Sequence, residues 1–163
     1  MREYALGSTD SDDISILTDN DVWIFGGAGN DNLTIRSVSS QDTSPNTDSD
    51  VICGGTGWDV IRSYSYSSID QKYLYSKGDG VDTIKDHRGI DCIYVWGCES
   101  ACFGKEPDND TSEYYPVYVD GEKVMRVDRR GIKEYRLYVN GKHTDTLTRN
   151  GEICNIIESA CPV

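Results

Sequence analysis

The sequence predicts an all-β protein, with a parallel β solenoid in residues 1–94 and an antiparallel β cap in residues 95–163. Three observations lead to this prediction. A nine-residue pattern recurs through the first segment, two hairpin signals occur in the second, and turn-forming residues are concentrated in the first. The first segment has 15 Asp and one Glu, whereas the second has 5 Asp and 7 Glu. Because Asp favours turns and Glu favours helices, the first segment is expected to consist of turns and short strands.

The overall charge narrows the classes of partner. The 163 residues include 16 Lys and Arg against 28 Asp and Glu, which gives a net charge of -12 and a pI near 4.4. This balance argues against a nucleic acid or an anionic membrane surface as the partner and favours cations. No run of apolar residues is long enough to span a bilayer, so no membrane span is expected.

The repeat is complete in two places. Residues 26–34 and 54–62 both read G-G-x-G-x-D-x-U-x, in which U is apolar. Residues 77–85 and 86–94 keep Gly at position four, Asp at position six and Ile at position eight. Together with three weaker windows, the chain has seven windows in all. The weaker windows keep only the Asp and the apolar residue, and they begin at Gly7, Ile16 and Pro45.

The parts of this repeat indicate a metal-binding turn. Glycines at positions one, two and four permit a tight turn whose carbonyl groups point inward, and the Asp at position six adds a carboxylate. Carbonyl and carboxylate oxygens are the ligands that Ca²⁺ prefers. The last three positions form a short strand with one side chain inward. Two windows then make one coil of about 18 residues, and stacked coils leave room for Ca²⁺ between successive turns.

With these nonapeptides the chain resembles the RTX (repeats-in-toxin) haemolysin-type family of secreted calcium-binding β-rolls, over residues 7–94. The resemblance implies a parallel β-roll (the RTX solenoid) that binds about two to four calcium ions. It has degenerate windows and an irregular Tyr/Ser-rich insert at residues 63–76, where Gln71 replaces the expected Asp. The resemblance implies that the metal is held within these windows by Gly26, Gly27, Gly29, Asp31, Gly54, Gly55, Gly57, Asp59, Lys77, Asp79, Asp82, Asp86 and Asp91, and less strongly by Asp50, Asp12 and Asp21. The implied interior side chains are Ile14, Trp23, Leu33, Ile52, Ile61, Ile84 and Ile93.

The second segment contains two hairpin signals. Residues 114–119 lead through Asp120-Gly121 into residues 122–127, and residues 132–139 turn at Asn140-Gly141 into residues 142–148. Asp-Gly and Asn-Gly between alternating apolar runs are typical of type I′ turns. We expect a four-stranded meander that closes the end of the solenoid, because a last coil would otherwise expose its apolar cross-section.

Six cysteines form an even set in an acidic chain with calcium motifs, which favours disulfides and an extracellular, secreted location over a zinc site. The spacing does not determine which of 15 pairings would form. The cysteines are Cys53, Cys92, Cys98, Cys102, Cys154 and Cys161.

The sequence predicts a non-catalytic module that folds on Ca²⁺ and serves adhesion or binding, with a polysaccharide or another extracellular protein as partner. It has no H-E-x-x-H, G-x-S-x-G or Walker motif, so no enzyme class is indicated. Two alternatives stay open. One is an accessory module of a secreted carbohydrate-active enzyme that binds an acidic polysaccharide, and the other is a small enzyme with an unrecognised site. The first alternative would use a basic cluster in the cap, formed by Arg126, Arg129, Arg130, Lys133 and Arg136.

Overall fold

A computed structural model describes residues 1–36, 50–64, 70–86, 88–108 and 113–155. Within these ranges the chain forms β-strands and no helix, so no described segment is a helix long and apolar enough to cross a membrane. The strands form two sheets, and most neighbouring strands in each sheet are parallel. The predicted all-β class, rich in parallel pairs, is therefore confirmed.

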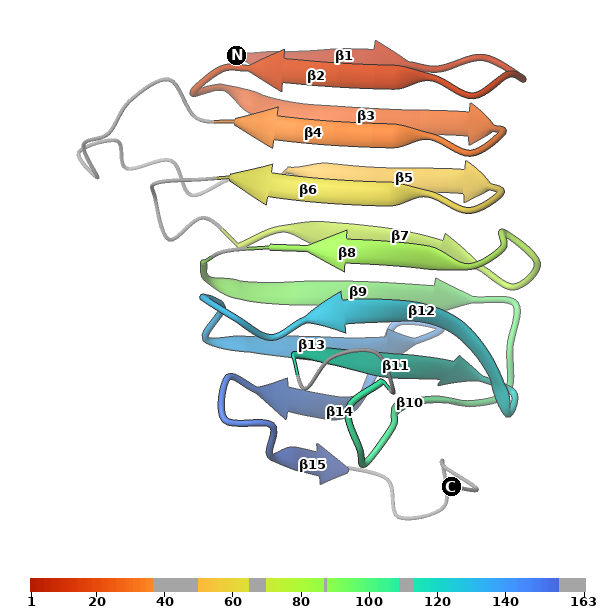
Figure 1. Ribbon diagram of the computed structural model, residues 1–163, viewed down its shortest axis with the longest axis vertical. Coiled ribbons are helices and arrows are strands. Elements are labelled where there is room, and N and C mark those ends of the chain that lie inside the picture. The colour runs from red at the N-terminus through yellow and green to blue at the C-terminus, as the bar shows by residue number, and fades with distance from the viewer. Residues whose placement is uncertain (37–49, 65–69, 87, 109–112, 156–163) are drawn as a thin grey trace.

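Successive strands alternate between the two sheets along the first part of the chain (Figure 1). In spatial order, the eight-stranded sheet contains β1 (Arg2–Leu6), β3 (Asp21–Ala28), β5 (Val51–Thr56), β7 (Lys72–Ser76), β9 (Ile90–Trp96), β13 (Glu134–Val139), β14 (Lys142–Thr148) and β15 (Ile153–Asn155). The seven-stranded sheet contains β10 (Ala101–Phe103), β11 (Tyr114–Val119), β12 (Glu122–Asp128), β8 (Asp82–Lys85), β6 (Val60–Tyr64), β4 (Asn32–Arg36) and β2 (Asp13–Leu17).

The repeat windows form the turns that connect the sheets. The turns that lead from β1 to β2, β3 to β4, β5 to β6 and β7 to β8 all lie on one side of the molecule, at the right in Figure 1. We call this side the glycine edge and the other side the opposite edge. Along the glycine edge, residues that occupy the same position in successive turns are 19, 28 and 23 residues apart in sequence. The expected uniform coil of about 18 residues is therefore wrong, because residues are inserted between windows.

The core lies between the sheets and is built from alternate residues of each strand. Five of the expected interior side chains are buried, and Ile14 is partly buried against them. Trp23 is a correction, because it packs edge-on against Tyr4 and Phe25 instead of entering the core. One extra residue before β3 shifts the register, and a one-residue shift turns every side chain of a strand to the other face. The five that are buried as expected are Leu33, Ile52, Ile61, Ile84 and Ile93.

Both predicted hairpins are present. Asp120 and Gly121 have φ values of 49° and 85°, and Asn140 and Gly141 have values of 47° and 83°. Two consecutive positive φ angles are what a type I′ turn requires, so the turn chemistry is as expected.

The expected four-stranded meander is wrong. Strand β12 pairs with β8 in a parallel register, and β13 pairs with β9, so the two hairpins extend different sheets. Each sheet of the first segment ends on a strand whose backbone groups need a partner, and each hairpin supplies one. Residues 1–94 and 95–163 therefore share both sheets and the same core.

Candidate functional site

One Asp from each glycine-edge turn stands in register with the next, forming what we call the Asp column: Asp12, Asp31, Asp59 and Asp82. In each step the Oδ1 atom of one Asp accepts the backbone N–H of the preceding Asp in the column. The N···O distances are 2.8 Å for Asp12 to Asp31, 2.8 Å for Asp31 to Asp59 and 3.1 Å for Asp59 to Asp82. The four column residues are the position-six Asp residues of the windows that begin at Gly7, Gly26, Gly54 and Lys77, as the repeat predicted.

The second carboxylate oxygen distinguishes the complete repeats from the incomplete one. The Oδ2 atoms of Asp31 and Asp59 are buried, and neither has a hydrogen-bond partner among the described residues. In the first turn, which lacks most of the glycines, Asp12 Oδ2 instead accepts the N–H and the hydroxyl of Ser8. Burying a carboxylate oxygen without a hydrogen-bond donor costs folding free energy. A positively charged partner at each of the two complete turns would remove this cost.

The first glycine of each complete repeat faces these oxygens. A Cβ added to Gly26 would lie 2.4 Å from Asp31 Oδ2 and 2.3 Å from the carbonyl oxygen of Gly54 in the next turn. A Cβ added to Gly54 would lie 2.3 Å from Asp59 Oδ2. Only glycine fits at these positions. At Gly26, a carboxylate and a carbonyl oxygen from adjacent turns therefore approach the same point, and both are the kind of ligand that Ca²⁺ takes.

The column carboxylates affect each other electrostatically. Burial raises the pKa of Asp59, and the charge of Asp31 adds to this effect. Burial, followed by the charge of Asp59, raises the pKa of Asp82 to about 8. These directions mean that the folded protein disfavours the ionised forms of Asp59 and Asp82. A bound divalent cation would offset both the burial and the repulsion.

A second column lies on the opposite edge, where Asp50, Gln71 and Asp91 stand in register. Asp50 Oδ1 accepts the N–H of Val22 at 2.8 Å, and Asp91 Oδ1 accepts the N–H of Gln71 at 2.9 Å. Asp91 is fully buried, and its Oδ2 has no hydrogen-bond partner in the described ranges. This edge therefore repeats the arrangement with one neutral amide in place of a carboxylate.

Two other expected ligands sit beside the second column. Asp21 lies one place before the column, where Val22 takes the stacked position because of the register shift at β3. Asp86 is buried, and the hydroxyl of Tyr73 donates to its Oδ2. Burial and the charge of Asp86 hold the pKa of Asp91 well above its usual range.

The remaining expected turn residues have structural partners. Asp79 Oδ2 accepts the N–H of Ser76 at 2.7 Å, which closes its own turn. The Lys77 ammonium forms a 2.6 Å ion pair with Asp120, so its side chain is occupied. Gly27, Gly29, Gly55 and Gly57 all have positive φ angles, as the tight turn requires.

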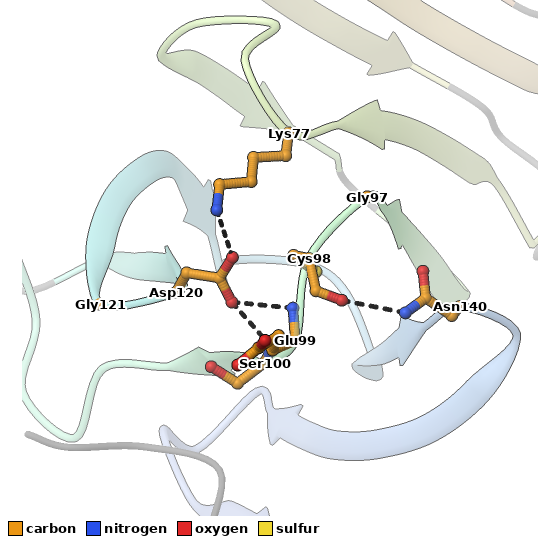
Figure 2. Close-up of a pocket in the computed structure, with 8 residues that line it drawn as sticks. All are labelled: Lys77, Gly97, Cys98, Glu99, Ser100, Asp120, Gly121 and Asn140. Carbon is orange, nitrogen blue, oxygen red and sulfur yellow. Dashed lines mark hydrogen bonds and ion pairs between the residues drawn. The ribbon is translucent and has the colours of Figure 1, made fainter.

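The Lys77–Asp120 pair lines a pocket of about 700 Å³ that the sequence did not indicate (Figure 2). Asp120 Oδ1 also accepts the backbone N–H groups of Glu99 and Ser100, each at 2.9 Å. The bond from Lys77, followed by the bond from Ser100, lowers the pKa of Asp120 to about 2. Both carboxylate oxygens of Asp120 have donors, so this residue holds the loop after β9 against the β11–β12 turn.

Side chains alone do not assemble a metal centre. Within the described ranges, no three His, Cys, Asp or Glu side chains lie close enough to hold one ion. The stacking explains this result, because each coil contributes one column carboxylate to an edge. Any ion between two turns would need backbone carbonyl groups, as at Gly26 and Gly54, to complete its ligands.

The cysteines differ from the sequence expectation. Cys53, Cys92 and Cys98 are free thiols, so the structure has no bridge at three of the six positions expected to be bridged. Cys102 is disulfide-bonded, while Cys161 and the side chain of Cys154 lie outside the described residues. Cys53 on β5 and Cys92 on β9 stand at outward positions of two strands that are not neighbours, because β7 lies between them.

We expect at least three thiols per chain to react with a maleimide in denaturant without reductant. In the folded protein, labelling at Cys53 should be slow near neutral pH, because burial raises the pKa of its thiol to about 11. Mass spectrometry of the labelled peptides measures the number of thiols that react in denaturant and the rate of labelling at Cys53 in the folded protein. A denatured, unreduced chain that takes up no label would contradict the free thiols.

The expected basic cluster of the cap does not form as one patch. Arg126 projects from the seven-stranded sheet and Arg136 from the eight-stranded sheet. Arg130 pairs with Asp128 and Glu113, and Arg136 pairs with Glu134. Two of the five charges, those of Arg130 and Arg136, are thus balanced locally.

A comparison with models of known protein families finds no match for this chain, and a comparison with curated proteins finds none either.

Proposed function

We propose that the protein is an extracellular β-roll module that binds Ca²⁺ along its glycine edge and serves adhesion or binding rather than catalysis. The observation that carries this proposal is the pair of buried, unpartnered Oδ2 atoms of Asp31 and Asp59 in the two glycine-complete turns. In the incomplete first turn, Ser8 satisfies the equivalent oxygen. The carboxylate oxygens without a hydrogen-bond donor thus occur in the two turns whose sequence matches the complete nonapeptide.

Asp31 and Asp59 would hold the ion with their Oδ2 atoms, and the Gly54 carbonyl would add a ligand from the neighbouring turn. The bound ion would supply positive charge that removes the repulsion along the column. The protein's own residues provide the rest, because the glycines keep space open and the Oδ1 ladder fixes each carboxylate. The two hairpins would cap the roll by extending both sheets.

The proposed extracellular location now depends on calcium rather than on cysteines. Weak extracellular sites bind Ca²⁺ at about 10⁻⁴–10⁻³ M, which is suited to a module with mixed carboxylate and carbonyl ligands. The expected disulfides were the other reason for an extracellular location, and three of the six cysteines are free thiols.

Isothermal titration with Ca²⁺ tests the proposal. Asp59→Asn should weaken binding by at least about tenfold, because an amide replaces a charged ligand on a divalent ion. Asp13→Asn is the matched control, because Asp13 is exposed at the start of β2, directly after the column. We expect the control to bind like the unaltered protein. Equal losses in both variants, or no calcium binding by the unaltered protein, would contradict the proposal.

A further inference from the structure

The outer side of the eight-stranded sheet carries a continuous apolar row. The row crosses neighbouring strands from β1 to β13, and its members stand in register from each strand to the next. Each member alternates along its strand with residues that pack in the core, so its side chain points away from the core. We call this side of the sheet, from β1 to β14, the aromatic face. The row consists of Leu6, Phe25, Cys53, Leu74, Tyr94 and Tyr138.

Stacked rings occupy the β13 end of this face. The ring of Tyr138 stacks on that of Tyr94, with centroids 4.8 Å apart, and on that of His143 from β14, with centroids 5.0 Å apart. The ring of Trp96 stacks on Tyr94 at 5.8 Å. Because these rings already hold one another in place, they would lose little conformational entropy on meeting a partner.

A second group of rings occupies the β1 end. Trp23 lies edge-on to Tyr4 at 5.9 Å and to Phe25 at 6.4 Å. Tyr4 is 63% exposed and Leu6 is 76% exposed, so large apolar side chains here lie open to water. An apolar surface that continues across a whole sheet is typical of a protein–protein interface.

The charges on the aromatic face balance one another. Arg136 forms a 2.6 Å ion pair with Glu134, and Arg2 stands beside Asp21 in register. Among the described residues, the outward positions from β1 to β13 and the exposed residue directly before Lys72 on β7 carry three cations and three acids. These are Arg2, Lys72, Arg136, Asp21, Asp70 and Glu134. The face is thus close to neutral on a chain of net charge -12, so two copies would not repel each other here as they do elsewhere.

The size of the face matches what a specific interface needs. Seven strands about 4.8 Å apart, each of about five residues at 3.3 Å, give a face of about 550 Å² in projection. The accessible surface of the side chains exceeds this projection. Two copies in contact would therefore bury about 1,100 Å² or more in total, which reaches the roughly 1,000 Å² expected of a specific interface.

The order of the strands makes the face complementary to itself. In the series β1, β3, β5, β7, β9, β13 and β14, strand β7 is central, and aromatic rings gather on either side of it. A two-fold axis that runs along β7 between two copies would set β1 and β3 of one copy against β14 and β13 of the other. Each group of rings would then face the other group across the interface.

We propose that the protein forms a two-fold symmetric dimer in which the aromatic faces of two copies pack against each other. The two sheets would lie about 10 Å apart with their strands within about 30° of each other, as in a β-sandwich. A second copy fits this face better than a strongly charged partner, because the face offers no net charge to either sign. The proposal goes beyond calcium binding, since the aromatic face contains no residue of the Asp column.

Sedimentation equilibrium at saturating Ca²⁺ tests the proposal. At about 100 µM the unaltered chain should have a mass of about 36 kDa, twice the 18.2 kDa of one chain. Leu6→Glu and Trp96→Ser should each raise the dissociation constant of the dimer at least about a hundredfold, because each substitution alters a two-fold interface twice. Circular dichroism checks that each variant remains folded.

Each test variant has a matched control on another surface. Leu17 is 65% exposed at the end of β2, in the other sheet of the same first coil, and Trp58 is 71% exposed on the glycine edge. Leu17→Glu and Trp58→Ser should change the dissociation constant less than about threefold. Equal losses in Leu6→Glu and Leu17→Glu would instead place the contact at the open end of the first coil and would overturn the aromatic face.

The remaining outcomes also decide the matter. A mass of 18.2 kDa at about 100 µM, or a dimer that Leu6→Glu and Trp96→Ser leave intact, would overturn the proposal. A dimer that survives denaturing electrophoresis without reductant would show a covalent link in place of the proposed packing. Asp59→Asn should dimerise like the unaltered protein, so a failure of the calcium proposal would leave this test unaffected.

Discussion

Removing calcium from a solution with about 10 mM Ca²⁺ at pH 8 is expected to lower the melting temperature by about 5–11 °C. That concentration is about a hundred times a Kd of 10⁻⁴ M, which stabilises the native state by about 2.7 kcal/mol, and each kcal/mol moves the melting temperature of a chain of this size by about 2–4 °C. The proposed reason is that removing Ca²⁺ would leave the carboxylates of the Asp column to repel one another without the charge of the ion. Differential scanning calorimetry with and without chelator measures it, and an unchanged melting temperature would contradict calcium binding to the native state.

The same experiment should depend on pH in a defined direction. Burial, followed by the charge of Asp59, raises the pKa of Asp82 from its ordinary value of 3.8 to about 8 in the folded protein. Between these values the folded state keeps a proton that the unfolded state has released, so stability falls as pH rises, by up to about 1.4 kcal/mol per pH unit for one group. The metal-free protein should therefore melt at a higher temperature at pH 5 than at pH 8. A metal-free protein that is more stable at pH 8 would contradict the buried column.

Gly57→Ala is expected to prevent stable folding or to destabilise the protein by at least about 3 kcal/mol. Gly57 has a φ of 138°, and a Cβ there would lie 1.7 Å from the carbonyl oxygen of Gly29 in the adjacent turn. Because the obstacle is backbone that is itself stacked between turns, it cannot move aside without opening the glycine edge.

Gly78→Ala is the matched control for this substitution. Gly78 also has a positive φ, 101°, but a Cβ there would meet nothing within 4 Å. We expect it to cost only the conformational strain, about 1–2 kcal/mol. Urea denaturation of both variants measures the difference. Equal destabilisation would show that turn stacking contributes nothing beyond backbone conformation.

The column and the hairpins could be predicted because their signals are local. An Asp with an apolar residue two places later marks each coil wherever the window falls, and Asp120-Gly121 and Asn140-Gly141 determine their own turn geometry. Trp23 could not be placed correctly. One residue inserted before β3 leaves the repeat recognisable in the sequence, but it turns each side chain of the strand to the other face of the sheet.

The arrangement of the hairpins depended on distant strands. Nothing in the local sequence of β12 or β13 indicates that they pair with β8 and β9, whose edges lie open in the first segment. The pairing of Arg62 with Lys85 was also missed, since the two residues are 23 residues apart in sequence and become neighbours only through the register of β6 and β8. Pairings of this kind come from the tertiary structure.

The Oδ1 ladder has a polarity that bears on how the chain is made. In every step the N–H donor belongs to the earlier coil and the carboxylate acceptor to the later one, from Asp12 through Asp31 and Asp59 to Asp82. The steps from Val22 to Asp50 and from Gln71 to Asp91 run the same way. A polypeptide that emerges N-terminus first presents each donor before its acceptor exists. Each coil can therefore complete its ladder bond only after the next coil has been made, so the coil that has emerged last always carries the donor that is still unpaired.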